Sequence, residues 1–286
     1  MKAAENDVLT RTGPGTPMGN LFRRFWQPVL LSRELPEPDC PPVRVKMMDE
    51  SLLAFRDTNG RVGLVEPRCP HRGADLFYGR NEQCGLRCAY HGFKFDTEGR
   101  CVDIPIVPKG DKQERMKAEV SIKAYPIHEA GDVIWAFMGP RDRMSAPPMF
   151  EFGLVPATNR WVSKKLQECN WAQTVEGAID TAHFTFLHAA VDEAATMEIM
   201  AQSEAGGSGD SRRVEWMLND GIPRYSIKPS DGGLILGGAR RADDGKSYWR
   251  IAQFLMPSTT FNPSTLAGDT YHGQTRVPVT DENMPD

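Results

Sequence analysis

Two short segments of the sequence combine a cysteine, a histidine and a glycine in nearly the same order. The first reads CPHRG, from Cys69 to Gly73, and the second reads CAYHG, from Cys88 to Gly92. The chain holds only six cysteines and six histidines. Each segment offers one thiolate and one imidazole, and glycine suits a loop whose backbone approaches a bound centre closely. The pattern therefore predicts a metal centre built by two loops.

The spacing of these residues is Cys69-x-His71, sixteen residues, then Cys88-x-x-His91. Chance placement of buried cysteines and structural histidines does not account for the repeat. A structural zinc site suits the ligand types, although the one-residue gap in the first segment is unusual for zinc. A [2Fe–2S] cluster with two Cys on one iron and two His on the other needs a thiolate and an imidazole from each loop. The spacing favours this third alternative.

A second group of chemically capable residues lies in NWAQTVEGAIDTAHFTFLHAA, which predicts one helix over residues 170–190. Glu176, Asp180 and His183 stand at i, i+4 and i+7, on one helix face. His188 follows five residues after His183, roughly 140° past one full turn. Both histidines could bind one metal only if the helix is distorted or ends near Thr185–Leu187. The alternative is that they are core histidines on an apolar helix.

The composition limits the functions that these residues can serve. Hydrophobic residues make up 40% and charged residues 25%, as in a globular protein, and the net charge of −4 gives no basic surplus for nucleic acid or anionic membranes. No apolar run is long enough to span a bilayer, and the N-terminus lacks the apolar core of a secretory signal. We therefore expect a cytoplasmic protein. The remaining cysteines are then ordinary reduced thiols, namely Cys40, Cys84, Cys101 and Cys169.

The elements that position these residues change in character along the chain. Residues 1–26 predict an N-terminal arm with a short helix. Residues 27–140 predict an all-β domain of short strands, with the DTNG and DTEG segments as hairpin turns. The proline-rich stretch 141–155 predicts a linker. Residues 156–286 predict an α+β domain with an antiparallel sheet, including strands at RWVSKKLQ (160–167) and RRVEWM (212–217).

The two paired segments, extended to CPHRGADL and CAYHGFKFD, resemble the Rieske signature. The stretches TPMGNLFRRFWQPVLLSREL, QECNWAQTVEGAIDTAHFTFLH and YWRIAQFLMP resemble the phthalate dioxygenase branch of the Rieske non-haem iron ring-hydroxylating oxygenases, which includes phenoxybenzoate dioxygenases. The resemblance covers nearly the whole chain. It implies that Cys69 and Cys88 bind one iron of the cluster, and that His71 and His91 bind the other.

By the same resemblance, His183 and His188 are ligands of a mononuclear Fe(II) in a helix-grip-like catalytic domain. Asp180 resembles the family's bridging aspartate, which orients His183 and links to a cluster histidine, here His91, of a neighbouring subunit. This implies a homotrimer or a stacked hexamer. Two further residues stand in matching positions with supporting roles, namely Asn170 and Glu176.

The family's iron triad also needs a carboxylate, supplied by an aspartate far downstream of the second histidine. The candidates in this chain are Asp192, Glu193, Glu198 and Asp269, and none stands in a segment that resembles the family's. The resemblance therefore predicts a C-terminally truncated chain whose catalytic domain is partial. An alternative function follows from this, an electron-transfer protein with an intact Rieske domain and an incomplete iron site.

The resemblance implies a terminal oxygenase that takes electrons from a separate NAD(P)H-dependent flavin/iron–sulfur reductase. With O2 it would dihydroxylate or monooxygenate a small aromatic substrate, O-demethylation and ether cleavage included. A carboxylated substrate needs cationic partners in an apolar pocket. Arg240 and Arg250 lie on predicted strands of the second domain and are candidates, with a solvated face as the alternative.

Overall fold

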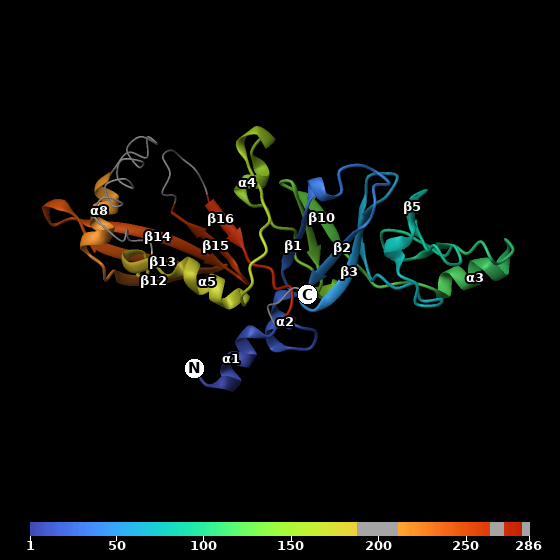
Figure 1. The fold of residues 1–286 in the computed structure, drawn as a ribbon, viewed down its shortest axis with the longest axis horizontal. Coiled ribbons are helices and arrows are strands. Elements are labelled where there is room, and N and C mark those ends of the chain that lie inside the picture. Colours follow the sequence, from blue (N-terminus) through green and yellow to red (C-terminus); the bar gives the residue numbers. More distant parts are fainter. Residues whose placement is uncertain (188–210, 264–271, 282–286) are drawn as a thin grey trace. The chain divides into compact units, whose positions relative to one another are not determined.

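The computed structural model describes residues 1–187, 211–263 and 272–281 (Figure 1). The chain forms two compact units, one of residues 1–170 with 277–286 and the other of residues 171–276. The predicted linker, 141–155, lies within the first unit, and the contacts divide the chain at Asn170–Trp171 instead. Within the described ranges, no helix has both the length and the apolar character needed to cross a bilayer.

The first unit is built from three small antiparallel sheets, ordered β1-β11-β10, β2-β3-β4-β9 and β5-β6-β7-β8. The strands are β1 (Trp26–Leu31), β2 (Val43–Met47), β3 (Glu50–Arg56), β4 (Val62–Val65), β5 (Arg80–Glu82), β6 (Gly85–Arg87), β7 (Lys94–Phe95), β8 (Cys101–Asp103), β9 (Ala124–Tyr125), β10 (Ile127–Ala130) and β11 (Val133–Phe137). The α-helices are α1 (Ala3–Thr10), α2 (Pro17–Phe22), α3 (Asp111–Glu119) and α4 (Glu151–Leu154).

The turns that connect these strands follow from local side-chain chemistry. In the DTNG turn, Asp57 Oδ1 accepts the N–H groups of Asn59 and Arg61. In the DTEG turn, Asp96 Oδ1 accepts the N–H groups of Glu98 and Arg100 in the same way. An aspartate that bonds its own backbone two residues on stabilises a turn without help from the rest of the fold. Both predicted hairpin turns are confirmed by the antiparallel pairing that flanks them.

The second unit packs helix α5 (Trp171–Ile179) against an antiparallel sheet in the order β12-β13-β14-β15-β16. Its other elements are α6 (Phe184–Leu187), α8 (Ser211–Asn219), β12 (Arg224–Ser230), β13 (Gly233–Arg241), β14 (Ser247–Leu255), β15 (Thr259–Asn262) and β16 (His272–Thr275). The buried face of α5 is formed by Trp171, Ala172 and Val175, at helical spacing. The predicted fold class, an all-β part followed by an α+β part with an antiparallel sheet, is confirmed.

Two of the predicted strands are wrong. RWVSKKLQ forms neither strand nor helix, and its Trp161 is 83% exposed. RRVEWM belongs to helix α8, where Met217 is buried and the indole N–H of Trp216 donates to Asp243 Oδ1. Val214 and Met217 stand three residues apart, a helical spacing that outweighs the strand propensity of the Val and Trp in this segment.

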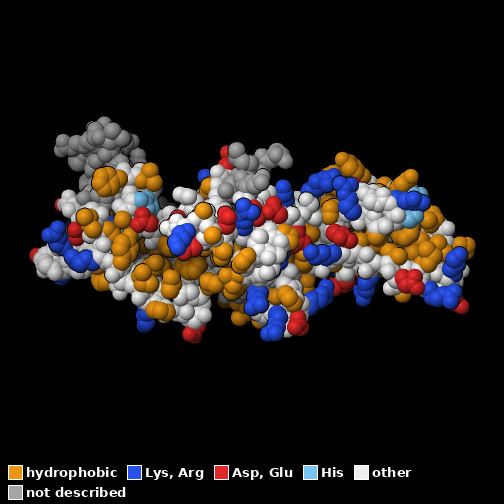
Figure 2. Space-filling view, turned by 90° about the horizontal axis from the view of Figure 1, so that it is seen from below, with side chains coloured by type: hydrophobic (Ala, Val, Ile, Leu, Met, Phe, Trp, Pro, Cys, Tyr) orange, Lys and Arg blue, Asp and Glu red, His pale blue; other side chains and the backbone are white. Residues whose placement is uncertain are grey.

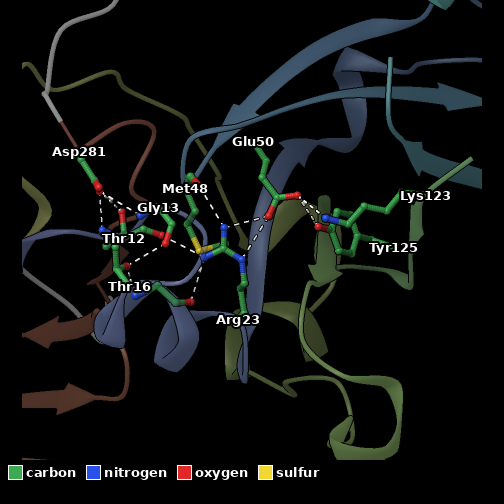
Figure 3. A network of polar contacts seen from close by, with 10 residues as sticks. Thr12, Gly13, Thr16, Arg23, Met48, Glu50, Lys123, Tyr125 and Asp281 are labelled. Atoms are coloured by element: carbon green, nitrogen blue, oxygen red, sulfur yellow. Dashed lines mark hydrogen bonds and ion pairs between the residues drawn. The ribbon is translucent and has the colours of Figure 1, made fainter. Parts of the chain in front are cut away.

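A buried polar network joins the N-terminal arm to the sheets of the first unit (Figure 3). The Arg23 guanidinium donates to the main-chain oxygens of Thr12, Gly19 and Met48 and forms an ion pair of 2.8 Å with Glu50. The Glu50 carboxylate also accepts from Lys123 Nζ at 2.7 Å.

Tyr125 and Asp281 extend this network in two directions (Figure 3). The Tyr125 hydroxyl donates to Glu50, and its pKa is raised to about 12 by burial and by this hydrogen bond. Asp281 Oδ1 accepts the N–H groups of Thr12 and Gly13. Segments from both ends of the chain thereby meet on one set of hydrogen bonds.

We expect Glu50→Ala to lower the free energy of unfolding by about 3 kcal/mol, because it leaves the Arg23 and Lys123 charges without their buried counter-ion. Burial alone would raise the pKa of Glu50, but the hydrogen bonds from Lys123, Tyr125 and Arg23 lower it overall. The contribution of Glu50 is therefore complete above its ordinary pKa of 4.5 and is lost as the pH falls through the lower folded-state value. Urea unfolding at pH 7 and in this acid range measures both effects.

The control is Glu98→Ala, which removes a carboxylate whose ion pair with Arg141 is more than half exposed on both sides. An exposed pair contributes about 0–1 kcal/mol. Equal losses for the two variants would contradict a stabilising role for the network of Glu50.

Candidate iron–sulfur site and catalytic turn

The two predicted ligand loops have the same backbone hydrogen bonds. The N–H of Cys69 donates to Ala74 O at 2.9 Å, and the N–H of Gly73 donates to Cys69 O at 2.8 Å. In the second loop, the N–H of Cys88 donates to Phe93 O at 2.8 Å, and the N–H of Gly92 donates to Cys88 O at 3.1 Å. Each loop is therefore the same five-residue turn, with the cysteine at its start and a glycine of positive φ at its end.

The structure brings the four predicted cluster residues together. The thiols of Cys69 and Cys88 are buried, at 2% and 3% exposure, and burial first, then the neighbouring Cys88, raises the pKa of Cys69 to about 11. The rings of His71 and His91 lie 4.5 Å apart, centroid to centroid, with an interplanar angle of 69°. Figure 2 shows histidine exposed beside basic and hydrophobic side chains at the end of this unit that carries β5 and α3.

These four residues fit an iron–sulfur cluster. The Nδ1 atoms of His71 and His91 are both buried and have no hydrogen-bond partner among the described residues, which is costly for imidazoles that hold no ligand. A thiol with a raised pKa becomes a thiolate once cations neutralise it. Among the described ranges, no three His, Cys, Asp or Glu side chains group around one point as ligands of a single ion. A binuclear cluster takes only two protein ligands per iron, so this arrangement suits it better than a zinc site.

The apolar core of the first unit surrounds the thiols and packs against one face of the His71 ring. Phe93 stacks on His71 with ring centroids 4.8 Å apart, and Leu76, Leu86 and Phe95 belong to the same buried cluster as Cys69 and Cys88. Tyr90 lies on the other side, 66% exposed, with its ring centroid 3.9 Å from that of His91. The site is therefore dry around the thiols and open to solvent beside Tyr90.

We expect Gly92→Ala to destabilise the loops more than Gly73→Ala. Both glycines have positive φ, +75° and +69°, where a Cβ costs about 1–2 kcal/mol. Only at Gly92 would that Cβ lie 2.5 Å from Pro105 Cγ, and such overpacking adds about 1–3 kcal/mol. Chemical unfolding and cluster content per chain measure the difference, and a larger loss for Gly73→Ala would contradict this account of the second loop.

The predicted single helix over 170–190 is wrong, because α5 ends at Ile179 and α6 begins at Phe184. The break has a local cause. Asp180 Oδ1 accepts the N–H of Ala182 at 2.8 Å and Oδ2 accepts the N–H of His183 at 3.2 Å, and such side-chain bonds replace those of a continuing helix. Asp180 and His183 therefore share a tight turn between two helices instead of one helix face.

The Asp180 carboxylate also selects the tautomer of the His183 ring. Its Oδ2 lies 3.1 Å from His183 Nδ1. Burial alone would raise the pKa of Asp180, but hydrogen bonds from Ala182, Tyr225 and His183 lower it overall, so the carboxylate is ionised near neutral pH. An ionised carboxylate only accepts, and Nδ1 must therefore carry a proton. The neutral imidazole then has an unprotonated Nε2, the form that binds a metal.

Tyr225 and Thr181 complete this turn, and neither belongs to the predicted site residues. The Tyr225 hydroxyl donates to Asp180 Oδ1 at 2.8 Å and accepts the N–H of Thr181 at 3.3 Å. Arg240 is fully buried and donates to the main-chain oxygen of Thr181 and, at 3.1 Å, to its hydroxyl. Tyr225 is on strand β12, 45 residues after Asp180 in the sequence. No local sequence pattern predicts that it contacts Asp180.

Arg250 lies near Arg240 on the sheet. It pairs with Gly238, two residues from Arg240 on β13, so the two side chains share a face. Arg250 is 7% exposed, and its guanidinium lies 3.7 Å from Met217 Sδ. Burial first, then the Arg250 charge, lowers the pKa of Arg240. The predicted substrate contacts of both arginines stay a prediction.

The other predicted site residues are placed as follows. Glu176 is exposed on α5, and its main-chain oxygen accepts the N–H of Asp180. Asn170 belongs to the first unit, where its side-chain Nδ2 donates to the main-chain oxygen of Thr10 at 3.2 Å. The predicted iron ligand His188 and the candidates for the third ligand, Asp192, Glu193, Glu198 and Asp269, lie outside the described residues.

Comparison with known proteins agrees with both parts of this geometry. Residues 25–126 match the Rieske [2Fe-2S] domain, and residues 136–285 match the family described as LigXa C-terminal domain like. The fold and the paired loops thus define a Rieske-domain protein with a second, α+β domain. The chain belongs to the LigXa C-terminal domain-like family, and the predicted resemblance to Rieske oxygenases is confirmed.

Curated relatives and a solved structure support this assignment. The chain is 37% identical to the oxygenase subunit of 3-chlorobenzoate-3,4-dioxygenase of Comamonas testosteroni, over 98% of this chain and 61% of that one. It is 37% identical to the oxygenase subunit of phthalate 4,5-dioxygenase of Pseudomonas putida, over 91% of this chain and 57% of that one. The chain thus spans less than two thirds of these relatives. The structure of dicamba monooxygenase bound to 3,6-dichlorosalicylic acid has the same fold, with a TM-score of 0.63 at 19% identity over 92% of this chain and 76% of that one.

Proposed function

We propose that this chain is the terminal oxygenase component of a Rieske non-haem iron oxygenase. It takes electrons from a separate flavin/iron–sulfur reductase and uses O2 to dihydroxylate or monooxygenate an aromatic substrate, O-demethylation and ether cleavage included. Cys69 and Cys88 hold one iron of the cluster, and His71 and His91 hold the other. The protein works in the cytoplasm as a homotrimer or stacked hexamer, so that a cluster in one subunit serves the catalytic turn of its neighbour.

The observation that carries this proposal is the contact of Asp180 Oδ2 with His183 Nδ1. A protein that only transferred electrons through its Rieske cluster would not need a further histidine outside the cluster. An ionised carboxylate that orients such a histidine, as Asp180 orients His183, is typical of a metal ligand. His183 and His188 are the proposed ligands of a mononuclear iron, which supplies O2 activation when bound. Asp180 keeps the Nδ1 proton in place and links His183 to the cluster histidine His91 of a second copy.

The proposed substrate is an aromatic carboxylate. Two of the relatives are named for 3-chlorobenzoate and phthalate, which are both aromatic carboxylates. The side chains of Arg240 and Arg250 lie on the same face of the sheet. On this face Arg240 contacts Thr181, which belongs to the turn of residues 180–183. Their summed charge favours an anion there.

Iron and acid-labile sulfide per chain, with an EPR spectrum of the reduced protein, test the proposal. We expect about three irons and two sulfides per chain, the content of a [2Fe–2S] cluster and one mononuclear site. About two irons with two sulfides would favour the electron-transfer alternative instead. Zinc without sulfide would contradict the cluster itself. With both centres present, a turnover screen compares aromatic carboxylates with the same rings lacking the carboxylate.

A further inference from the structure

The carboxylate of Asp180 accepts four hydrogen bonds within its own chain, while its side chain is 42% exposed. Its Oδ1 accepts from Ala182 N at 2.8 Å and from the Tyr225 hydroxyl at 2.8 Å. Its Oδ2 accepts from His183 N at 3.2 Å and from His183 Nδ1 at 3.1 Å. An ionised carboxylate has about four lone-pair positions, and these four donors fill them. A further donor from outside the chain reaches the exposed side of Asp180 and competes with one of them.

Only one of the four donors can leave without breaking the catalytic turn. Ala182 and His183 follow Asp180 directly, and their N–H groups are held by the turn that leads into α6. The Nδ1–H of His183 sets the form of the imidazole that binds a metal. Tyr225 comes from strand β12, is 48% exposed, and carries its hydroxyl at the end of a side chain that rotates independently of the turn.

The structure also gives the Tyr225 hydroxyl a second partner. The N–H of Thr181 donates to it at 3.3 Å, so a hydroxyl that leaves Asp180 keeps one hydrogen bond. Arg240 fixes Thr181 through its main-chain oxygen and its hydroxyl. The sheet packs tightly at this point, since a Cβ on Gly238 would lie 2.5 Å from Thr181 Cγ2. The partner of the displaced hydroxyl is therefore rigid.

We propose that Tyr225 occupies the acceptor position of Asp180 that the cluster histidine of a second copy takes, and that its hydroxyl is displaced when two copies join. Tyr225 is thus a positioning residue that acts through Asp180. Its hydroxyl and the cluster histidine of the second copy compete for the same carboxylate oxygen. This inference rests on the proposed function, because it requires Asp180 to be the bridge. Joining the copies exchanges one hydrogen bond to the carboxylate for another.

Tyr225→Phe tests the competition, because it removes the hydroxyl and keeps the ring. We expect the assembled protein to dissociate at about fivefold lower concentration in a sedimentation dilution series, the effect of one hydrogen bond no longer to be displaced. We also expect the reduced cluster to be reoxidised about fivefold faster in a single turnover with substrate and O2. Tyr248→Phe, a tyrosine on β14 of the same sheet, is the matched control and should leave both measurements unchanged.

Asp180→Ala and the double variant Asp180→Ala/Tyr225→Phe separate this inference from the proposed function. If the competition exists, the double variant equals Asp180→Ala in both measurements. Unchanged or weaker association of Tyr225→Phe, with Asp180→Ala clearly weakened, overturns the role of Tyr225 alone. Association and reoxidation that do not respond to Asp180→Ala overturn the bridge itself, and with it both proposals.

Discussion

Replacing Asp180 with alanine is expected to lower turnover by about 100-fold while the absorption and EPR spectra of the cluster stay unchanged. The substitution removes the carboxylate whose two oxygens hold the backbone of the turn and whose Oδ2 also keeps the proton on His183 Nδ1. The imidazole then loses both its tautomer preference and its orientation. The cluster loops belong to the other compact unit and share none of these hydrogen bonds.

Steady-state turnover, iron content and the cluster spectrum check this prediction together. Asp231→Ala is the control, since it removes an exposed carboxylate from the turn between β12 and β13 of the same unit. A variant at position 180 that turns over at the normal rate would exclude the proposed role of Asp180. Loss of the cluster spectrum in the same variant would instead show that the effect is general unfolding.

Replacing Cys88 with alanine is expected to abolish the cluster, with a loss of about two irons and two sulfides per chain. The thiol is 3% exposed and lies in the same buried cluster of side chains as Cys69. Without this thiolate one iron retains a single protein ligand.

Cys101→Ala is the matched control for this substitution. Cys101 is 5% exposed and belongs to the same apolar cluster, and burial raises the pKa of its thiol, as it does for Cys69. Both variants delete one buried sulfur, so the cost of the cavity is similar in each. Equal loss of iron from the two variants would mean that packing of the core, rather than ligation, explains the result.

The sequence by itself determined the features that depend on near neighbours. The types and spacing of Cys69, His71, Cys88 and His91 predicted a two-loop centre, because each loop is one short turn closed by its own backbone. The DTNG and DTEG turns were predictable for the same reason. The break after α5 was also within reach, since an aspartate that caps the N–H groups two and three residues later is a local pattern.

Only the tertiary structure decided which distant residues complete the turn formed by residues 180–183. Tyr225 and Arg240 reach it from 45 and 59 residues away, through the register of β12 and β13. Register follows from the pairing of whole strands across the sheet, and no short stretch of sequence encodes that pairing. The same holds for Glu50, whose partners Arg23 and Lys123 lie 27 and 73 residues away. Ligand types are properties of a segment, whereas hydrogen-bond partners are properties of the packed fold.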